Sequence, residues 1–449
     1  MRHVTFVRPA LGEGPSADAM TPLVFAILRE LTPPEIATTL IDERIEPFAP
    51  VPTDLVAMTV ETFTARRAWE IADAYRARGV PVVVGGHHPS MVPEEAEAHA
   101  DAVVIGDGEA VWGEILRDAA NGRLKPRYEA AVGAGPRPAP DRSIFVGKRY
   151  APVSLVQVGR GCRFACDFCS IHAFYGTHRE QRPVAEVVAE IETLPSGRMI
   201  FFVDDNLLFR RDRFEALMRG LAPLKRRWSC QISIDVARDD RLLDLMAAAG
   251  CALVLIGFES LRRDNLKQMR KNWNGVAGAY DDVIARLRAR GIMLYGTFVF
   301  GYDADRPEDF ETTARFAEAM GMAIANFNPL TPMPGTGLIA RLAEEGRLLR
   351  PTWWLDPAHR YGDAIFRPLG MSADELRDGP TAARAIFYGF RSIAARALRG
   401  LPRWGVVNTG LMLLANFVSR REIARKQAAP LAARKDPDPT GEGAPCGSP

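Results

Sequence analysis

The chain lacks several features that are typical of secreted and membrane-spanning proteins. Its 449 residues contain only six cysteines, and their spacing forms no disulfide framework, which favours a reducing compartment. No charged segment followed by an apolar one opens the sequence, so we expect no secretory signal and a cytoplasmic location. The longest apolar stretch, residues 404–418, is interrupted by polar residues and is too short to span a bilayer. This stretch predicts either a core helix or a helix that lies on a membrane surface.

An excess of charge of one sign is also absent. The chain has 57 Lys and Arg residues against 55 Asp and Glu residues, for a net charge of +2, so nothing in the composition indicates a nucleic-acid partner. Hydrophobic residues make up 47% and charged residues 25% of the chain, which is ordinary for a globular protein. A chain of this length predicts about three domains, and we expect a small-molecule substrate.

Three of the six cysteines, Cys162, Cys166 and Cys169, lie in one short segment with the spacing C-x3-C-x2-C. Thiolates this close together can share one metal centre, and they suit zinc or an iron–sulfur cluster. A centre with only three protein ligands keeps an open position, which catalysis needs. Two interpretations compete: an iron–sulfur site, or a structural zinc site with His172 as the fourth ligand. The segment follows the apolar run 153–158, at the expected carboxyl end of a barrel strand, which favours the iron–sulfur site.

The segment from Gly161 to Cys169, with Phe168 before its last cysteine, resembles the signature of the radical S-adenosylmethionine (SAM) enzymes, C-x3-C-x-aromatic-C. The resemblance implies that the three cysteines hold three irons of a [4Fe–4S] cluster and that the fourth iron binds the methionine part of SAM. In that family an electron from the cluster cleaves SAM, and the resulting 5′-deoxyadenosyl radical abstracts hydrogen from an sp3 carbon. Phe168 is expected either to cover the adenine of SAM or to pack under the cysteine segment.

The first part of the chain alternates short apolar runs with amphipathic segments. Helices are expected near residues 21–31 and 66–78. The apolar runs predict strands at His3–Val7, Thr38–Ile41, Leu55–Val60, Pro81–Val84 and Ala102–Ile105. Five such strands with helices between them indicate an α/β fold with a doubly wound, flavodoxin-like parallel sheet. Ligands of such sheets bind at the carboxyl ends of the strands.

Small and polar residues follow these strands, at Thr59, Thr62, Gly85, Gly86, Gly106, Gly108 and Glu109. The glycines could serve only to make tight turns, or they could let the backbone approach a bulky cofactor closely. Their order resembles the cobalamin-binding domain that precedes many radical SAM enzymes, over residues 1–135. The resemblance implies that these residues surround the corrin ring and the nucleotide tail of cobalamin.

The first strand–helix loop, residues 8–16, lacks the histidine that binds cobalt in many cobalamin domains. We therefore expect a bound cobalamin whose cobalt has no imidazole ligand from the protein. His87, His88 and His99 are interpreted as ordinary loop residues.

After a linker at 136–146, residues 147–347 again alternate strands and helices. Strands are predicted at Val153–Val158, Met199–Val203, Ser229–Ile234, Leu253–Ile256, Leu294–Phe300 and Ala323–Asn328. Six β/α units match a partial (β/α)6 TIM-like barrel, which is the fold of the radical SAM family. The resemblance implies that Asp204 and Asp205 contact the amino group of SAM and that Glu259 contacts its methionine or ribose part. Alternatively, these acids cap the helices that follow the strands.

The last part of the chain, residues 348–427, reads as mostly helical, with helices at 372–378, 381–398 and 404–426, before a disordered tail at 428–449. Its aromatic residues are either core or the lining of a substrate mouth: Trp353, Trp354, Tyr361, Phe366, Phe387, Tyr388 and Phe390. Of the remaining cysteines, Cys230 and Cys251 are interpreted as buried core thiols and Cys446 as incidental.

As a whole, the chain resembles the cobalamin-dependent radical SAM enzymes that include anaerobic magnesium-protoporphyrin ester cyclase and the hopanoid methylases. The resemblance implies a C-methyltransferase in which hydrogen abstraction is followed by methyl transfer from methylcobalamin, with flavodoxin or ferredoxin as the electron donor. Two alternatives stay open: radical oxidation, cyclisation or rearrangement with cobalamin as the redox partner, or a zinc-binding scaffold without catalysis. The aromatic C-terminal part hints at a large hydrophobic substrate.

Overall fold

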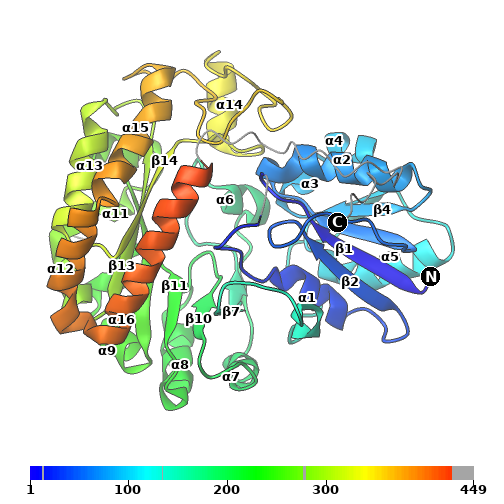
Figure 1. The fold of residues 1–449 in the computed structure, drawn as a ribbon, viewed down its shortest axis with the longest axis horizontal. Coiled ribbons are helices and arrows are strands. Elements are labelled where there is room, and N and C mark those ends of the chain that lie inside the picture. The colour runs from blue at the N-terminus through cyan, green and yellow to red at the C-terminus, as the bar shows by residue number, and fades with distance from the viewer. Residues whose placement is uncertain (13–14, 134, 277–279, 427–449) are drawn as a thin grey trace, which may run out of the picture.

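The computed structural model describes residues 1–12, 15–133, 135–276 and 280–426, which form two parallel sheets flanked by helices (Figure 1). The N-terminal sheet has the strand order β2-β1-β3-β4-β5-β6, and all neighbouring strands are parallel. Its strands are β1 (His3–Arg8), β2 (Ala37–Asp42), β3 (Leu55–Thr59), β4 (Val82–Gly85), β5 (Ala102–Ile105) and β6 (Arg127–Glu129). The five predicted strands are confirmed. The short edge strand β6 is an addition, and only Tyr128 of its three residues is buried.

Helices cover both faces of this sheet, which confirms the doubly wound architecture. They are α1 (Leu23–Glu30), α2 (Ala65–Arg76), α3 (His87–Met91), α4 (Pro93–His99) and α5 (Trp112–Ala120). On one face, the ring of Phe6 packs against Phe25 of α1 and Trp112 of α5, with centroids 5.2 and 5.8 Å apart. On the other face, Trp69 of α2 joins a core that includes Met58 of β3. Alternate residues of the strands thus serve two separate cores.

The three histidines of this region were expected in loops, and that expectation is wrong. His87 and His88 lie in α3 and His99 lies at the end of α4. His88 is fully buried, with Nε2 3.0 Å from Glu95 Oε1, whereas the ring of His99 stacks on Trp69 at a centroid distance of 5.3 Å. Pro93 at the start of α4 and Gly86 before α3 permit these short helices so soon after a strand.

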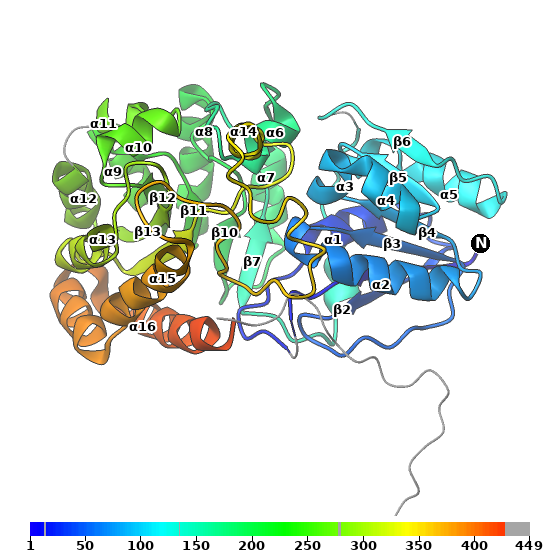
Figure 2. The same cartoon turned by 90° about the horizontal axis from the view of Figure 1, so that it is seen from above.

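The second sheet is the partial barrel that the sequence predicts (Figure 2). Its strand order is β14-β13-β12-β11-β10-β7, all parallel, and β14 and β7 are its two ends. The strands are β7 (Val153–Val156), β10 (Met199–Phe202), β11 (Trp228–Gln231), β12 (Cys251–Glu259), β13 (Met293–Phe300) and β14 (Ile324–Pro329). An antiparallel pair, β8 (Gly159–Arg160) and β9 (Glu180–Gln181), brackets the cysteine segment. The predicted strand 229–234 ends early, because Ile234 turns into a buried 3-10 helix.

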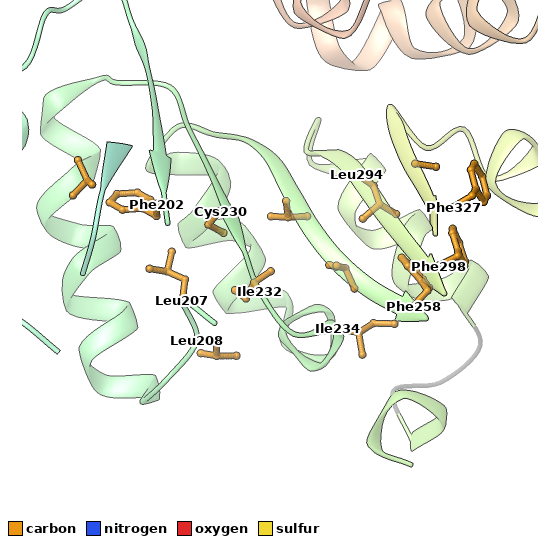
Figure 3. Packing of buried hydrophobic residues seen from close by; sticks show 14 of the residues in the cluster. Phe202, Leu207, Leu208, Cys230, Ile232, Ile234, Phe258, Leu294, Phe298 and Phe327 are labelled. Atoms are coloured by element: carbon orange, nitrogen blue, oxygen red, sulfur yellow. The ribbon is translucent and has the colours of Figure 1, made fainter. Parts of the chain in front are cut away.

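The helices of this part are α7 (Val184–Glu192), α8 (Arg211–Leu221), α9 (Asp240–Ala248), α10 (Arg263–Gln268), α11 (Trp273–Val276), α12 (Tyr280–Ala289) and α13 (Glu308–Ala319). The short helix α6 (Ser170–Tyr175) follows the cysteine segment and contacts α3 of the N-terminal part. Figure 3 shows the packed layer between strands and helices, where Phe258, Phe298 and Phe327 follow one another across β12, β13 and β14. Their centroids are 5.6 Å apart in each pair, an offset-stacked ladder that ties the three strands together.

The C-terminal part is helical, as predicted, but its helix boundaries differ. The helices are α14 (Gly337–Glu344), α15 (Ala373–Phe387) and α16 (Phe390–Lys426), and α16 is kinked at Gly405, which has φ 72°. A helix break was expected at residues 379–380, yet α15 continues through Pro380. Gly379 there lets α15 pack closely on α13, since a Cβ at this position would lie 2.2 Å from the ring of Phe310.

Helix α16 closes the amino ends of the barrel strands. Trp404 and Met412 form a small buried cluster with Met293 and Ala323, which lie at the starts of β13 and β14. The predicted core role of this stretch is therefore confirmed for one side of the helix. No helix in the described part of the chain is long and apolar enough to cross a membrane. The predicted disordered tail at 428–449, with Cys446, lies outside the described residues.

Candidate functional site

The cysteine segment forms a loop above the carboxyl end of β7, between β8 and α6. Cys166 is buried, and Cys162 and Cys169 are half-buried. Burial raises the pKa of the Cys166 thiol to about 12, and the nearby Cys169 and Cys162 add to this rise. The three sulfurs therefore lie close enough to influence one another. Three converging thiols, partly shielded from water, are the donor set that an iron–sulfur cluster takes.

The alternative zinc site is not formed by the predicted side chains. Among the described residues, no group of three His, Cys, Asp or Glu side chains is placed to hold a single metal ion. His172 Nδ1 lies instead 3.2 Å from the carbonyl oxygen of Gly176, within its own short helix. The predicted fourth zinc ligand is therefore engaged within its own helix.

Asp204 and Asp205, at the end of β10, hold the backbone that leads into the cysteine loop. The carboxylate of Asp204 accepts hydrogen bonds from the amides of Val158 and Gly159, and Asp205 accepts one of 2.9 Å from Gly161. Neither caps a helix, since α8 begins six residues later with Arg210 as its N-cap, so the capping interpretation is wrong. Burial raises the pKa of Asp204 to about 7, although the two amide donors act to lower it.

Glu259, the last residue of β12, adopts a left-handed backbone conformation with φ 64°, which is unusual for a residue with a side chain. Its carboxylate does not cap α10 but accepts from the ammonium group of Lys271, with an N–O distance of 2.7 Å. Both side chains are about nine-tenths buried. The pair lies over Gly257, where a Cβ would come within 2.1 Å of the Glu259 carboxylate. A strained, buried charge pair at a strand end is typical of functional sites.

Lys271 was not predicted as a site residue, and it connects the ion pair to the cysteine loop. Its ammonium group lies 5.1 Å from the ring centre of Trp273, which stacks on Phe164 of the loop at 3.7 Å. The guanidinium carbon of Arg163 also lies over the Phe164 ring, 4.8 Å from its centre. This stack fixes the loop between its first two cysteines. A single lysine in a sequence looks like a surface residue, so no sequence pattern indicated this role.

Phe168 lies partly buried at the edge of the barrel core. Its ring meets Tyr302 edge-on at 6.4 Å, and the Tyr302 hydroxyl donates to Asp167 at 2.7 Å. The structure thus places Phe168 against the barrel core beside Tyr302.

A second site lies where the carboxyl ends of the N-terminal strands face the barrel. It is a cavity of about 270 Å³. Of the predicted cobalamin residues, six line it: Thr59, Gly85, Gly86, Gly106, Gly108 and Glu109. Thr62 does not, and its hydroxyl lies instead 3.3 Å from His88 Nδ1. Apolar side chains of α1 and α5 form the deep wall, so the cavity fits a cofactor with a bulky, partly apolar tail.

Two of these glycines are required by the backbone itself. Gly86 has φ 105° and Gly106 has φ 85°, and both conformations disfavour a side chain. A Cβ on Gly106 would lie 2.2 Å from the carbonyl oxygen of Ala130, and one on Gly86 would lie 2.8 Å from Thr59 Oγ1. The tight-turn explanation therefore holds for this pair.

The barrel contributes to the same cavity through Arg160 of β8. Its guanidinium group pairs with Asp107 at 2.9 Å and with Glu109 at 2.5 Å. Burial acts to raise the pKa of Glu109, but the charge and hydrogen bond of Arg160, together with the charge of Arg137, lower it. His87 also lines the cavity, and burial lowers its pKa, which favours the neutral imidazole. Because Arg160 lies two residues before Cys162, this ion pair couples the cavity to the cysteine loop.

The interior of the open barrel is accessible, unlike the packed interior of a closed TIM barrel. Along β12, β13 and β14, residues that face the helices are buried, and the alternate, inward-facing residues are only half-buried. The inward set is Leu253, Leu255, Gly257, Tyr295, Thr297, Val299, Asn326 and Asn328. The inner face of these strands therefore carries a mixed apolar and amide lining.

A doubly wound parallel sheet with a cavity at its strand ends is thus joined to an open barrel with a three-cysteine loop. Residues 156–317 match the family model of the Radical SAM superfamily, and residues 35–116 match that of the B12 binding domain. The bacteriochlorophyllide d C-12(1)-methyltransferase of Chlorobaculum tepidum is 32% identical over 395 residues, which cover 85% of each chain. The C-8(2)-methyltransferase of the same organism is 30% identical over 354 residues, covering 74% of this chain and 78% of the relative.

The solved structures agree with the fold. The radical SAM methyltransferase TsrM from Kitasatospora setae, with cobalamin and a [4Fe–4S] cluster bound, superimposes with a TM-score of 0.62 at 20% identity, covering 95% of this chain and 99% of that chain. The chain therefore belongs to the cobalamin-dependent radical SAM methyltransferases, and its cofactors are a [4Fe–4S] cluster, SAM and cobalamin. The family, fold and cofactor set expected from the sequence are confirmed.

Proposed function

We propose that this enzyme methylates an unactivated carbon on a large tetrapyrrole of the bacteriochlorophyllide type. The observation that carries the proposal is the link between the cysteine loop and the cavity at the carboxyl ends of the N-terminal strands. Arg160, two residues before Cys162, lines this cavity and pairs there with Asp107 and Glu109. The names of the two relatives, which span most of this chain, support the substrate class. The inward-facing Leu255, Tyr295 and Val299 offer apolar contacts to such a ring.

We assign Cys162, Cys166 and Cys169 as the cluster ligands, and Asp204, Asp205, Glu259 and Phe168 as the SAM-binding residues. Thr59, Gly85, Gly86, Gly106, Gly108 and Glu109, which line the cavity, are assigned to cobalamin. Together, the bound cofactors supply radical hydrogen abstraction and a transferable methyl group. The chain's own contribution is to hold the cysteine loop through the Asp204 and Asp205 carboxylates and to shield the reaction from water with the barrel wall.

The proposal also includes the domain boundaries of the chain and the cellular compartment in which the enzyme works. A cobalamin-binding domain spans 1–135, the barrel spans 147–347 after a linker at 136–146, and a helical domain spans 348–427. The free cysteines support a reducing cytoplasm as the working compartment. A flavodoxin or ferredoxin would supply the electron that cluster chemistry needs.

The proposal is tested with full-length protein that is purified anaerobically and supplied with iron, sulfide, cobalamin and a reductant. Incubation with methyl-labelled SAM and bacteriochlorophyllide d should give a labelled, methylated product together with 5′-deoxyadenosine. The variants C162A, C166A and C169A should each lose bound iron and all product. The variant C251A should retain iron, because Cys251 is a buried thiol distant from the loop in the fold. Formation of 5′-deoxyadenosine with an oxidised or cyclised but unmethylated product would refute methyl transfer.

A further inference from the structure

Helix α16 leaves an unusual surface exposed on the side away from the barrel. Among the described residues, ten large hydrophobic side chains are exposed, and seven of them belong to α16. They are Phe390, Leu398, Leu401, Val406, Val407, Leu414 and Phe417. Val406 is 80% exposed and Leu398 is 71% exposed. The rest of the surface shows no comparable concentration of apolar side chains within the described residues.

The kink at Gly405 folds α16 into a helical hairpin, so that these side chains share one face. The buried Arg396 of the first half donates to Asn416 of the second half at 2.9 Å. On the outer side, the rings of Phe390 and Phe417 meet at 6.4 Å. We call the exposed face with these seven side chains the hairpin face. Its tip is formed by Leu398, Leu401, Val406 and Val407, around the kink.

The exposed charged side chains that the structure describes on α16 are all arginines. Arg391, Arg399, Arg403, Arg420 and Arg421 are exposed on α16, and none of them forms an ion pair with a carboxylate within the described residues. Arg288 of α12 joins them at the tip, where burial and the positive charges of Arg403 and Arg399 lower its pKa. The carboxylates nearby are otherwise engaged: Glu318 pairs with Arg315 at 3.3 Å, and Glu422 is buried.

An amphipathic helical hairpin with exposed apolar side chains and uncompensated arginines has the chemistry of a surface that binds anionic lipid. A second copy of the chain is a poorer occupant. A symmetric contact would bring the same arginines of both copies together, which is unfavourable. We propose that the hairpin face of α16 docks the enzyme onto a negatively charged membrane surface, with the tip inserted between headgroups.

The placement of this surface is compatible with catalysis at the membrane. The hairpin packs against the amino ends of β13 and β14, and the cysteine loop lies at the opposite, carboxyl end of the barrel. Docking through α16 would therefore leave the substrate opening uncovered. The inference does not depend on the identity of the substrate, and vesicle binding can be measured without turnover.

The test is sedimentation of the full-length enzyme with vesicles of phosphatidylcholine alone or mixed with phosphatidylglycerol. The wild type should bind the mixed vesicles and release as salt is raised. The double variant V406S/V407S should bind about tenfold more weakly for each valine removed. The variant R399Q/R403Q should bind roughly thirtyfold more weakly.

Two matched controls separate this effect from a general change of the surface. Val146 is 81% exposed but lies in the segment before β7, so V146S should bind like the wild type. Arg210 is exposed and paired with Asp212 on α8, so R210Q should also be neutral. Equal binding to both vesicle types, or equal loss in V146S and V406S/V407S, would overturn the proposal. So would a dimer in light scattering that V406S/V407S dissociates, because the face would then bind a second copy.

Discussion

The ion pair between Glu259 and Lys271 leads to the sharpest prediction about the active site. The two groups are 2.7 Å apart, with side chains 10% and 8% exposed. Replacing Lys271 by Met keeps the apolar stem and removes the charge, so the Glu259 carboxylate would remain buried without its partner. Breaking a buried pair from one side costs about 3–5 kcal/mol of unfolding free energy. We expect K271M to lower the free energy of unfolding by an amount in this range.

The same change should disturb the cofactor site. The carboxylate of Glu259 is held over Gly257 on a backbone with φ 64°, and Lys271 is the cation that fixes it there. Without that cation, we expect the Glu259 side chain to turn toward water, which would move its carboxylate away from the place where it is assigned to contact SAM. SAM binding by the anaerobic, cluster-loaded protein should therefore weaken in K271M, and it should stay weak in the double variant E259Q/K271M, which lacks the assigned carboxylate.

The assay is urea unfolding followed by tryptophan fluorescence, with SAM affinity measured on the same preparations. The matched control is K267M, because Lys267 pairs with Asp264 in full exposure, and exposed pairs contribute about 0–1 kcal/mol. The double variant E259Q/K271M should regain part of the free energy of unfolding that K271M loses. Compared with both single variants, it gives the coupling energy between Glu259 and Lys271. If K271M and K267M unfold at the same urea concentration and bind SAM equally, the reasoning about the buried pair is refuted.

Two further predictions concern the backbone and the pH response. Gly106→Ala should lower the free energy of unfolding by roughly 2 kcal/mol or more, because the position has φ 85° and the new Cβ would meet the Ala130 carbonyl. Gly122 has a positive φ as well but open space around it, so Gly122→Ala should cost only about 1 kcal/mol. Thermal denaturation of the two variants will distinguish these values. Burial raises the pKa of Asp204 from 3.8 to about 7 in the folded state, so the protonated form is favoured there. The stability that protonated Asp204 contributes to the folded state is therefore lost as the pH rises from about 4 to about 7. The unfolding free energy of the wild type should fall relative to D204N by at most about 1.4 kcal/mol per pH unit in this window. A constant difference between pH 5 and pH 8 in urea titrations would contradict the buried environment of Asp204.

The sequence predicted the structural elements that depend mainly on residues close together in the chain. Apolar runs such as 102–105 and 294–300 become strands because β-branched and aromatic residues fit a pleated, buried surface. The spacing of Cys162, Cys166 and Cys169 within one loop likewise indicated a shared metal centre before any fold was known. The helix boundaries were less predictable, since Pro380 normally ends a helix and here is retained by packing against α13.

The roles of the acidic residues were open in the sequence, because a carboxylate after a strand can cap a helix or reach a neighbouring loop. The fold decided this through parallel pairing, which brings the end of β10 beside the loop after β7 and so places Asp204 under amides 45 and 46 residues away. The segment after α10 brings Lys271 back to Glu259, and the packing of the N-terminal part against the barrel places Arg160 within reach of Glu109.

By itself, then, the amino-acid sequence determined the secondary structure pattern, the cysteine loop and the order of the two cofactor-binding parts. Only the tertiary structure decided which charges are paired, which inward-facing residues stay accessible in the open barrel, and which side of α16 remains uncovered. The physical reason is that local pattern sets which face of an element is apolar, whereas the partner that covers this face comes from distant parts of the chain.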